Sequence, residues 1–401
     1  MPHAGECMSR KTIALILACG FMASCGGGNS DPETTINGVT DTEIVIGSFA
    51  DLSGPAALLG LDAVNGARQR FDEINAAGGI HGRKIRFVVE DTQYQLPKAI
   101  QAVNKLVNRD KVFAMFLGLG TPMNNAVMQT LFDANVPNIF PISGARQMVV
   151  PFRPMMFTAR GVYYDEIRAG VRYFVEERGA ESICVMYQDT DYGVEILEAA
   201  QDQATEMGIE IAAVSAHKPT DTEFTAAVLR VRNSGCKTVM LGTIYKDTIL
   251  IFEAARKIGW DDVAFVGQNA SYSKAVAAAE SGAAEGYYAF VHIAVIYGDD
   301  EMSPDVARWY GRFKELFGSD PGYAAIEGYR NADVLAIALQ NAGRELNPGT
   351  LIRGLESMWD YQDIFGYHLT FGPDDHKGVD ESILTTVKDG RWVILEESIR
   401  Y

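Results

Sequence analysis

Short apolar runs alternate with amphipathic segments of helical length through most of the chain from residue 43 onward. The run EIVIGSFA at 43–50 predicts a strand, and the segment 55–77 carries Val64 and Phe71 on a helical repeat before it ends at Gly78. The runs KIRFVVED, VFAMFLG and PNIFPISG continue the series as strands. Strands of this kind, separated by amphipathic helices, are typical of a parallel sheet covered by helices on both faces.

The same alternation begins again near residue 165. The strand-like runs SICVMYQD, KTVMLGTIY and VAFVGQNA are separated by segments of helical length. The sequence therefore predicts two Rossmann-like, doubly wound α/β units, each with a parallel sheet. The last third starts no third unit, and its segment ILTTVKDGRWVIL predicts a β-hairpin that turns at Asp389-Gly390.

This last third is too short to be a domain, so we expect it to complete both units, which we call the first and the second lobe. The chain must then cross between the lobes more than once, and several parallel crossings form a hinge that suits closure around a ligand. Our candidate crossings are residues 159–161, 286–289 and 365–369. The first lobe is then 43–160 with 288–364, and the second lobe is 161–287 with 365–401.

The first 25 residues predict a secretory signal peptide that ends at a lipidated cysteine. A short basic region precedes an apolar stretch that is too short to span a bilayer, which needs ~20 residues. Cys25 stands where a bacterial lipoprotein is cleaved and lipidated, with Cys19 as a rival site. We favour Cys25 over Cys19 or an ordinary cleaved signal peptide, because residues 26–42 are typical of a flexible tether. We therefore expect a periplasmic protein that is held at the membrane only by its lipid.

Charge and cysteine content narrow the possibilities further. The formal net charge of -17 argues against nucleic acid and anionic membrane surfaces as partners, because both repel an acidic protein. Cys184 and Cys236 are the two cysteines outside the leader, and they could pair in an oxidising compartment. We favour two buried free thiols over a disulfide.

The sequence carries no recognisable catalytic set. Its six histidines are scattered, and it has no H-E-x-x-H zinc motif, no G-x-S-x-G elbow and no G-x-x-x-x-G-K-[ST] loop. The cluster Asp374-Asp375-His376 could hold a cation, but a solvated turn is the better interpretation. We therefore expect no enzymatic activity, no cofactor and no metal.

The segment LGLGTPMNNAVMQT at 117–130 follows a predicted strand and opens a helix. Gly120 gives backbone access, Thr121 can cap the helix, and the helix start offers N–H groups to an anion. Met123 occupies the place of the third glycine in a dinucleotide loop, so a nucleotide phosphate is the poorest candidate for that anion. A small carboxylate is the best candidate, although Thr121 could serve only as a cap. The loop Ser143-Gly144-Ala145 repeats the arrangement after the next strand.

Tyrosines gather at the predicted strand ends of the second lobe and near the first crossing. They are Tyr192 and Tyr245 at the strand ends, and Tyr163 and Tyr164 near the crossing. Each alone is more often a packing residue. Together they favour a cleft, because tyrosine supplies an apolar face and one hydrogen-bonding end to a small amphipathic ligand.

Several segments resemble the periplasmic leucine/isoleucine/valine-binding protein family, the type I substrate-binding component of ABC transporters. They are NGARQRFDEINAAGGI, VPNIFPISGA, YQDTDYG and VAFVGQ. The resemblance covers essentially all of the chain after the leader. It implies the type I periplasmic binding protein fold with three crossings, a ligand trapped by closure, an ABC permease as partner and no catalysis. We expect a monomer.

The resemblance also implies a ligand site. A ligand carboxylate would meet the Thr121 hydroxyl and the loop of Ser143, Gly144 and Ala145, with side-chain contacts from Leu59, Tyr192 and Tyr245. Asn269 departs from the family, whose amino-acid binders place a glutamate there for the ligand ammonium. A buried ammonium without a counter-charge costs several kcal/mol, unless another acid substitutes. The hypothesis is a ligand with a carboxylate or amide end and a largely apolar or aromatic remainder.

Two other functions remain open. The same fold serves as a ligand-sensing receptor or regulator, but the leader and the lack of a signalling domain favour delivery of a solute. An enzyme with two Rossmann-like lobes, such as a glycosyltransferase, would need a nucleotide loop or catalytic acids.

Overall fold

The computed structural model describes residues 36–400 of the 401-residue chain. The predicted leader with Cys25 and residues 26–35 of the predicted tether lie outside the described residues. Over the described range, no helix combines the length and the apolar character that a bilayer crossing requires.

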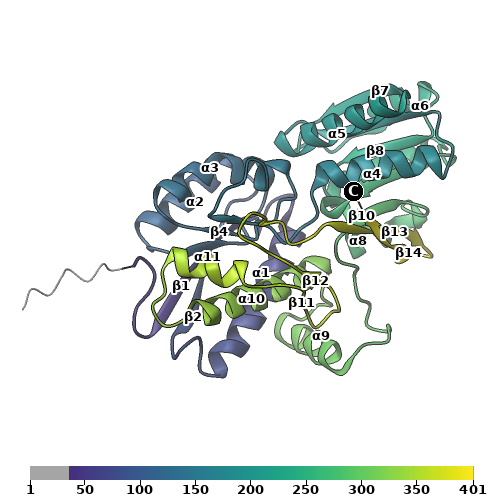
Figure 1. Cartoon of the computed structure of the whole chain (residues 1–401). Coiled ribbons are helices and arrows are strands. Elements are labelled where there is room, and N and C mark those ends of the chain that lie inside the picture. The colour runs from purple at the N-terminus through teal and green to yellow at the C-terminus, as the bar shows by residue number, and fades with distance from the viewer. Residues whose placement is uncertain (1–35, 401) are drawn as a thin grey trace, which may run out of the picture. The chain divides into compact units, whose positions relative to one another are not determined.

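Five parallel strands form the first sheet, in the order β2-β1-β3-β4-β5 (Figure 1). They are β1 (Glu43–Ala50), β2 (Lys84–Asp91), β3 (Ala114–Phe116), β4 (Asn138–Ile139) and β5 (Met156–Phe157). The connections are the helices α1 (Ala57–Ala76), α2 (Leu96–Asn108) and α3 (Thr121–Asp133) and the short 3-10 helix η1 (Arg146–Met148).

Side chains of β1 alternate between the two faces of this sheet, as strand geometry requires. Ile44 and Ile46 belong to the same buried cluster as Phe71 of α1. Val45 and Phe49 belong to a second cluster, with residues of α2 and α3. Helices therefore cover both faces, as the apolar character of the strand predicts.

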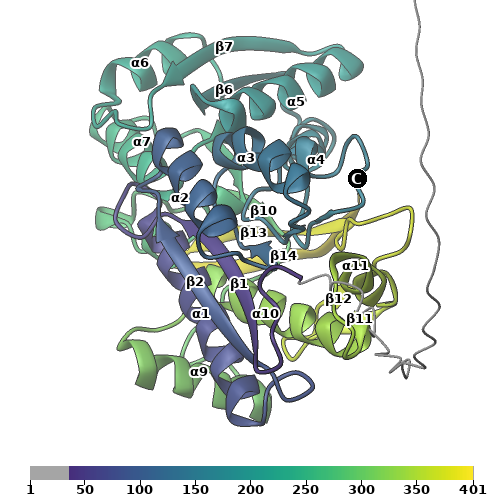
Figure 2. The ribbon, with the colours of Figure 1, turned by 90° about the vertical axis from the view of Figure 1, so that its left-hand side faces the viewer.

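Three later helices complete the first lobe: α9 (Pro304–Phe317), α10 (Tyr323–Ala342) and α11 (Pro348–Glu356). Helices α1 and α10 run side by side (Figure 2) because glycines remove side chains from their contact. A Cβ added at Gly66 would lie 2.1 Å from the Ala325 carbonyl oxygen, and one at Gly328 would lie 2.0 Å from that of Ala63. Any larger residue at either position would force the two helices apart.

The second sheet has seven strands, in the order β14-β13-β10-β9-β8-β6-β7. Its parallel strands are β6 (Ser182–Gln188), β7 (Glu210–His217), β8 (Thr238–Gly242), β9 (Ala264–Gln268) and β10 (Tyr288–Val291). Its helices are α4 (Tyr163–Glu176), α5 (Asp191–Met207), α6 (Thr225–Asn233), α7 (Tyr245–Lys257) and α8 (Lys274–Ala277), with the 3-10 turns η2 (Asn269–Ser271) and η3 (Glu280–Gly282).

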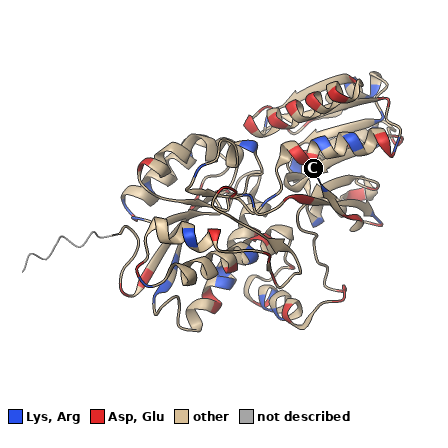
Figure 3. Ribbon diagram, in the orientation of Figure 1, with Lys and Arg blue, Asp and Glu red and all other residues tan. Residues whose placement is uncertain are grey.

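The predicted hairpin is confirmed as β13 (Glu381–Lys388) and β14 (Arg391–Arg400), which pair antiparallel at the edge of the second sheet. Asp389 and Gly390 both have positive φ, 53° and 72°. A two-residue type I′ turn needs positive φ at both positions, because only then does its twist match that of the two strands. The two doubly wound lobes are confirmed as well. Most charged residues lie on helices and loops, and most strands carry few (Figure 3), as burial between helix layers demands.

The chain passes between the lobes three times. The first crossing lies between β5 and α4, the second between β10 and α9, and the third between β12 (His368–Leu369) and β13. The first and third crossings pair, because the Thr158 N–H donates to the His376 carbonyl at 3.0 Å and the Gly378 N–H donates to the Thr158 carbonyl at 2.8 Å. The three-crossing hinge of the type I fold is therefore present.

Two of the expected boundaries fall too early. Strand β10 pairs with β9 and β13, so the chain leaves the second lobe after residue 291 and not at 288. The third crossing comes after 365–369, because β12 pairs with β11 (Tyr361–Gln362) in a small separate sheet. Strands this short carry too few residues to show a change of sheet in the sequence pattern.

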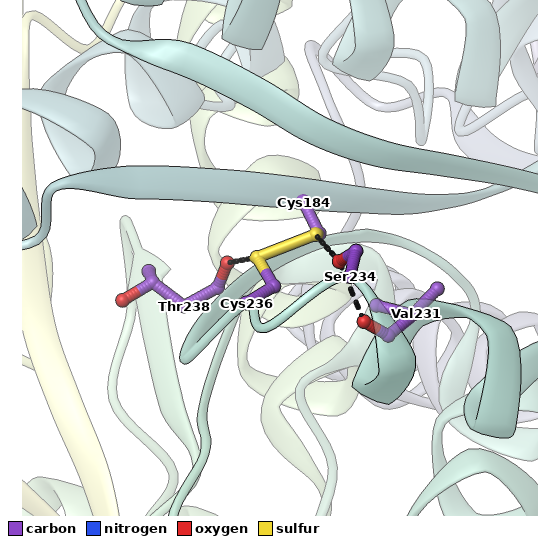
Figure 4. The surroundings of a disulfide bond; sticks show 5 residues. All are labelled: Cys184, Val231, Ser234, Cys236 and Thr238. Carbon is purple, nitrogen blue, oxygen red and sulfur yellow. Dashed lines mark hydrogen bonds between the residues drawn. A yellow bond between two sulfur atoms is a disulfide. The ribbon is translucent and has the colours of Figure 1, made fainter.

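The expectation of two free thiols is wrong, because Cys184 and Cys236 form a disulfide (Figure 4). Cys184 lies in β6, and Cys236 lies just before β8, the strand next to β6 in the sheet. Their Cα atoms are 6.1 Å apart, within the usual range for the bond. The Ser234 hydroxyl lies 3.3 Å from the Cys184 sulfur and donates to the Val231 carbonyl at 2.7 Å.

Replacing Cys184 and Cys236 together by alanine should lower the free energy of unfolding by about 2–4 kcal/mol, because the bond constrains the unfolded chain. Chemical denaturation without reductant measures the difference. Reductant should bring the wild type to the stability of the double variant. Peptide mapping that finds the two cysteines unlinked before reduction would contradict the assignment.

Candidate functional site

A small cavity lies where the carboxyl ends of strands from both sheets meet, the place at which open α/β sheets bind ligands. Its walls are Ala56, Leu59, Tyr94, Leu119, Gly120, Thr121, Ile142, Arg160, Tyr163, Tyr192, Ile244 and Ala270. Its volume is about 30 Å³. A solute of several heavy atoms therefore needs the walls to move apart before it can enter.

Two larger hollows are open to the surface, with volumes of about 640 and 790 Å³. The first is lined by residues of the second lobe at the amino ends of its strands, among them Ser182 and Thr238. The second is lined by residues of the first lobe alone, such as Arg70 and Trp309. Neither draws on both lobes, so the small cavity is the candidate site.

Thr121 begins α3 at the cavity and is 3% exposed. The expected capping role of its hydroxyl is wrong, because Gly120 is the N-cap residue and no side chain caps this helix. Gly120 has φ 102°, a conformation that a residue with a side chain rarely adopts. The Thr121 hydroxyl instead lies 2.7 Å from the Ser143 hydroxyl, so the two predicted loops meet through their side chains.

Tyr163 connects the loop of Ser143 with the second lobe. Its backbone N–H donates to the Gly144 carbonyl at 2.8 Å, and a Cβ at Gly144 would lie 2.7 Å from its ring carbon Cε1. Glycine at 144 therefore lets the ring lie against the backbone. The Tyr163 ring also contacts the ring of Tyr192 of the second lobe, edge to face, with the ring centroids 5.3 Å apart.

The Tyr192 hydroxyl is occupied inside its own lobe. It donates to the Thr243 carbonyl at 2.9 Å and accepts from the Gln268 side chain. Burial raises the pKa of Tyr192 well above its ordinary value, so the phenol stays neutral. Tyr192 therefore offers the cavity an aromatic surface but no free proton.

Four predicted site residues lie away from the cavity walls. Ala145 packs in a cluster with methionines, among them Met148. Tyr164 is partly exposed, and its hydroxyl donates to Asp202 at 2.5 Å. Tyr245 is half-buried; burial raises its pKa, and the nearby backbone N–H of Leu58 opposes that rise. Asn269 is fully buried in the hinge.

Asn269 uses both ends of its amide inside the protein. Its Nδ2 donates to Glu166 Oε1 at 2.7 Å, and its Oδ1 lies 2.7 Å from His292 Nδ1. The structure thus brings together Leu59, Gly120, Thr121, Tyr163 and Tyr192 at the cavity, with Ser143 and Gly144 directly behind them. Their contact with a ligand stays a prediction.

Arg160 and Tyr94 are cavity residues that the sequence reasoning missed. Tyr94 follows the carboxyl end of β2, and the same strand-end criterion that selected the other tyrosines would have found it. Arg160 stands in the candidate crossing 159–161, where a charge among apolar neighbours was the available signal. Its importance depends on Glu327, far away in the sequence.

Arg160 is 1% exposed, and its side chain is held by four oxygens. Its Nε donates to Glu327 Oε1 at 3.0 Å and its Nη2 to Glu327 Oε2 at 2.5 Å. The remaining partners are the Tyr163 hydroxyl at 3.0 Å from Nη1 and the Tyr323 hydroxyl at 3.2 Å from Nη2. Burial alone would raise the pKa of Glu327, but the charge of Arg160 outweighs it and keeps that pKa far below its ordinary value.

Two titratable side chains next to this ion pair, Glu166 and His292, are neutral near pH 7. Burial raises the pKa of Glu166 to about 8, although Ser382, Arg160 and Asn269 oppose the shift. Burial also lowers the pKa of His292 to about 4, against the charge of Glu327. A second buried charged pair lies nearby: Arg330 Nε is 4.0 Å from Asp363 Oδ2, and Arg330 also donates to the Ala159 carbonyl of the first crossing at 2.5 Å.

The buried carboxyl of Glu166 predicts a pH-dependent stability. Its pKa rises from 4.5 to about 8 on folding, so its contribution to stability is complete below the lower value and lost as pH rises through the upper one. Glu166→Gln should therefore gain thermal stability relative to the wild type between pH 5 and about 8 and hold that gain above it. Unfolding scans across this range measure the difference.

The exposed Glu177, at the end of the same helix, is the control, since Glu177→Gln removes a charge without touching the hinge. A constant difference between wild type and Glu166→Gln from pH 5 to 9 would contradict the assignment.

Hydrogen bonds join the two lobes beside the cavity. Asn125 of α3 donates to Asp191 of α5 at 2.8 Å. The Arg146 backbone N–H donates to Glu195 at 2.8 Å, and its guanidinium to Glu198 at 2.5 Å. These contacts belong to a closed arrangement of the lobes.

Asn125→Asp should open the lobes, because two carboxylates would then face each other across the contact with Asp191. We expect a larger radius of gyration by X-ray scattering in low salt, and a return toward the wild-type value at about 1 M salt, where the screening length is about 3 Å. The matched control is Gln129→Glu, which places the same charge beside Asp133 within α3 itself. Equal radii for Asn125→Asp and wild type would contradict the closed contact.

The chain is similar in sequence to bacterial periplasmic binding proteins. The sequence profile of a family described as periplasmic binding protein matches residues 43–391. Leu/Ile/Val-binding protein homolog 8 of Brucella abortus is 24% identical over 350 residues, which cover 83% of this chain and 85% of the relative. A leucine-, isoleucine-, valine-, threonine- and alanine-binding protein of Pseudomonas aeruginosa is 22% identical over 314 residues, which cover 78% and 82%.

Solved structures share the fold. A fatty acid ABC transporter substrate-binding protein from Thermomonospora curvata superposes with a TM-score of 0.81 at 23% identity, covering 91% of this chain and 94% of the other. A branched-chain amino acid transporter substrate-binding protein from Streptococcus pneumoniae, in complex with isoleucine, gives 0.75 at 22% identity, covering 90% and 100%. These two neighbours are named for different ligands. The likeness therefore establishes the fold of this chain but does not identify its solute.

Proposed function

Because the chain belongs to the periplasmic binding protein family, we propose that it captures a small carboxylate with an apolar or aromatic remainder between its lobes and delivers it to an ABC permease. The observation that carries this proposal is the composition of the cavity wall. Among the described residues that line it, Arg160 is the only one with a charged side chain, and it is a cation. An anionic ligand is therefore favoured over a cationic one.

The anion end is assigned to the first lobe. The hydroxyls of Thr121 and Ser143 lie together at the first turn of α3, where helix N–H groups and the helix dipole favour negative charge. Charge-assisted hydrogen bonds of this kind are the strong ones. Thr121 is therefore the residue expected to contribute most to carboxylate binding.

The rest of the cavity is assigned to the apolar part of the ligand. Its walls there are Leu59, Tyr94, Leu119, Ile142, Tyr192 and Ile244. Aromatic and aliphatic side chains of this kind bury hydrocarbon or a ring, and a few polar groups fix its orientation.

Three described residues at and around Asn269 offer no free counter-charge to an α-amino group. Glu327 is taken by Arg160, Glu166 is neutral near pH 7, and the amide of Asn269 is bonded at both ends. A desolvated ammonium would remain unpaired, which is costly. We therefore propose carboxylates without an α-amino group as the preferred solutes.

The same proposal includes the predicted leader. A monomer with its signal peptide cleaved before Cys25, lipid-anchored at that residue in the periplasm, would keep the binding lobes near the permease. Residues 26–42 would then serve as the tether.

Matched pairs of acids test the proposal. Calorimetry should show 4-methylpentanoate and 3-phenylpropanoate binding about tenfold or more tightly than leucine and phenylalanine, which add only the α-amino group. Thr121→Ala should weaken the binding of both acids about tenfold or more, because a hydrogen bond to a charged group contributes ~1.5–3 kcal/mol. Thr130→Ala, at an exposed position on the same helix, is the control. Tighter binding of leucine than of 4-methylpentanoate would refute the proposal.

A further inference from the structure

We propose that Arg160 fixes the Tyr163 hydroxyl as a hydrogen-bond donor into the cavity, so that Tyr163 supplies a second donor to the carboxylate held at Thr121. Arg160 is then a positioning residue that acts on the ligand through Tyr163. The inference rests on the proposed function and names the group that completes its anion site.

The direction of the hydrogen bond between these residues follows from chemistry alone. A guanidinium has five N–H donors and no acceptor. Arg160 Nη1 lies 3.0 Å from the Tyr163 hydroxyl oxygen, so that oxygen must be the acceptor. The phenol proton then points away from Arg160. The Gly144 backbone N–H also faces the hydroxyl oxygen, which makes that oxygen an acceptor again. Among the described residues no acceptor meets the phenol proton, and Tyr163 lines the cavity.

Arg160 cannot turn away to release this constraint. Both oxygens of Glu327 hold its guanidinium, and the Tyr323 hydroxyl takes a further N–H. Glu327 and Tyr323 lie on α10, which the glycine contacts lock against α1. The position of the guanidinium is therefore set by the first lobe, while Tyr163 begins the first helix of the second lobe.

The two donors, Thr121 and Tyr163, line the same cavity. The Tyr163 ring rests on Gly144, and the neighbouring Ser143 hydroxyl is 2.7 Å from that of Thr121. A carboxylate has two oxygens that accept several hydrogen bonds. It can therefore accept from Thr121 and from Tyr163 at once.

The other tyrosine in this cluster gives a contrast. The Tyr192 hydroxyl donates its proton to the Thr243 carbonyl and accepts a hydrogen bond from the Gln268 side chain. Of these two rings in edge-to-face contact, only Tyr163 has a hydroxyl proton without an acceptor among the described residues. A ligand oxygen at this end of the cavity is thus recognised by Tyr163 and merely contacted by Tyr192.

Calorimetry with 4-methylpentanoate and 3-phenylpropanoate on the full chain tests the inference. Tyr163→Phe removes only the hydroxyl and should weaken both acids about tenfold, the loss expected for one hydrogen bond to a charged group. Tyr164→Phe, which removes a hydroxyl outside the cavity, should bind as the wild type does. Equal affinity of Tyr163→Phe and wild type would overturn the inference.

A double-mutant cycle tests the role of Arg160. Arg160→Lys keeps a charge for Glu327 but lacks the planar fork that reaches Glu327 and Tyr163 together. It should weaken both acids in the wild type and add little in the Tyr163→Phe background, because both changes remove one coupled interaction. Fully additive losses would mean that Arg160 does not act through Tyr163.

Failure of the proposed function has a different signature. If the wild type binds neither acid, the proposal of a carboxylate ligand is refuted, and the inference falls with it. If the wild type binds them and Tyr163→Phe binds them equally, the proposed function stands and only the inference fails. If Arg160→Lys does not fold, the single variant Tyr163→Phe still decides whether Tyr163 donates a hydrogen bond to the carboxylate, which is the inference's central claim.

Discussion

A buried ion pair, Arg160 with Glu327, is the interaction on which the rest of this structure depends. Both side chains are 1% exposed, so each would be a costly isolated charge without the other. The pair joins the first crossing to α10, the helix that is locked against α1. The ion pair therefore holds the first crossing, where it borders the cavity, against α1 and α10 of the first lobe. Removing one partner would leave the other charge buried and unpaired, which is strongly destabilising.

The same pair also determines the chemistry of the cavity. Arg160 lines the cavity whereas Glu327 does not, so a solute in the cavity would meet the cation and its bound phenol. The neighbouring Glu166 and His292 are neutral near pH 7, and Asn269 bridges them. The proposed anion would lie against the wall that carries the Thr121 and Tyr163 hydroxyls, beside these neutral groups.

Much of the fold could be predicted from the sequence. A strand that is buried between two helix layers needs apolar side chains on both faces, and β1 and β6 therefore stand out as short apolar runs. The hairpin at Asp389-Gly390 was equally visible, since its turn needs particular residues. The strand pairing of β10 and the disulfide were missed, because both depend on which strands become neighbours. In the site, strand ends pointed to Thr121, but Arg160 gained its role only through a partner on a distant helix.

A crystal structure of the full chain with 3-phenylpropanoate tests the central claim most directly. The account predicts one carboxylate oxygen within hydrogen-bond distance of the Thr121 hydroxyl, the Tyr163 hydroxyl also donating to the carboxylate, and the phenyl ring among Leu59, Tyr94 and Tyr192. A carboxylate that faces the second lobe, or a ligand bound outside this cavity, would contradict it.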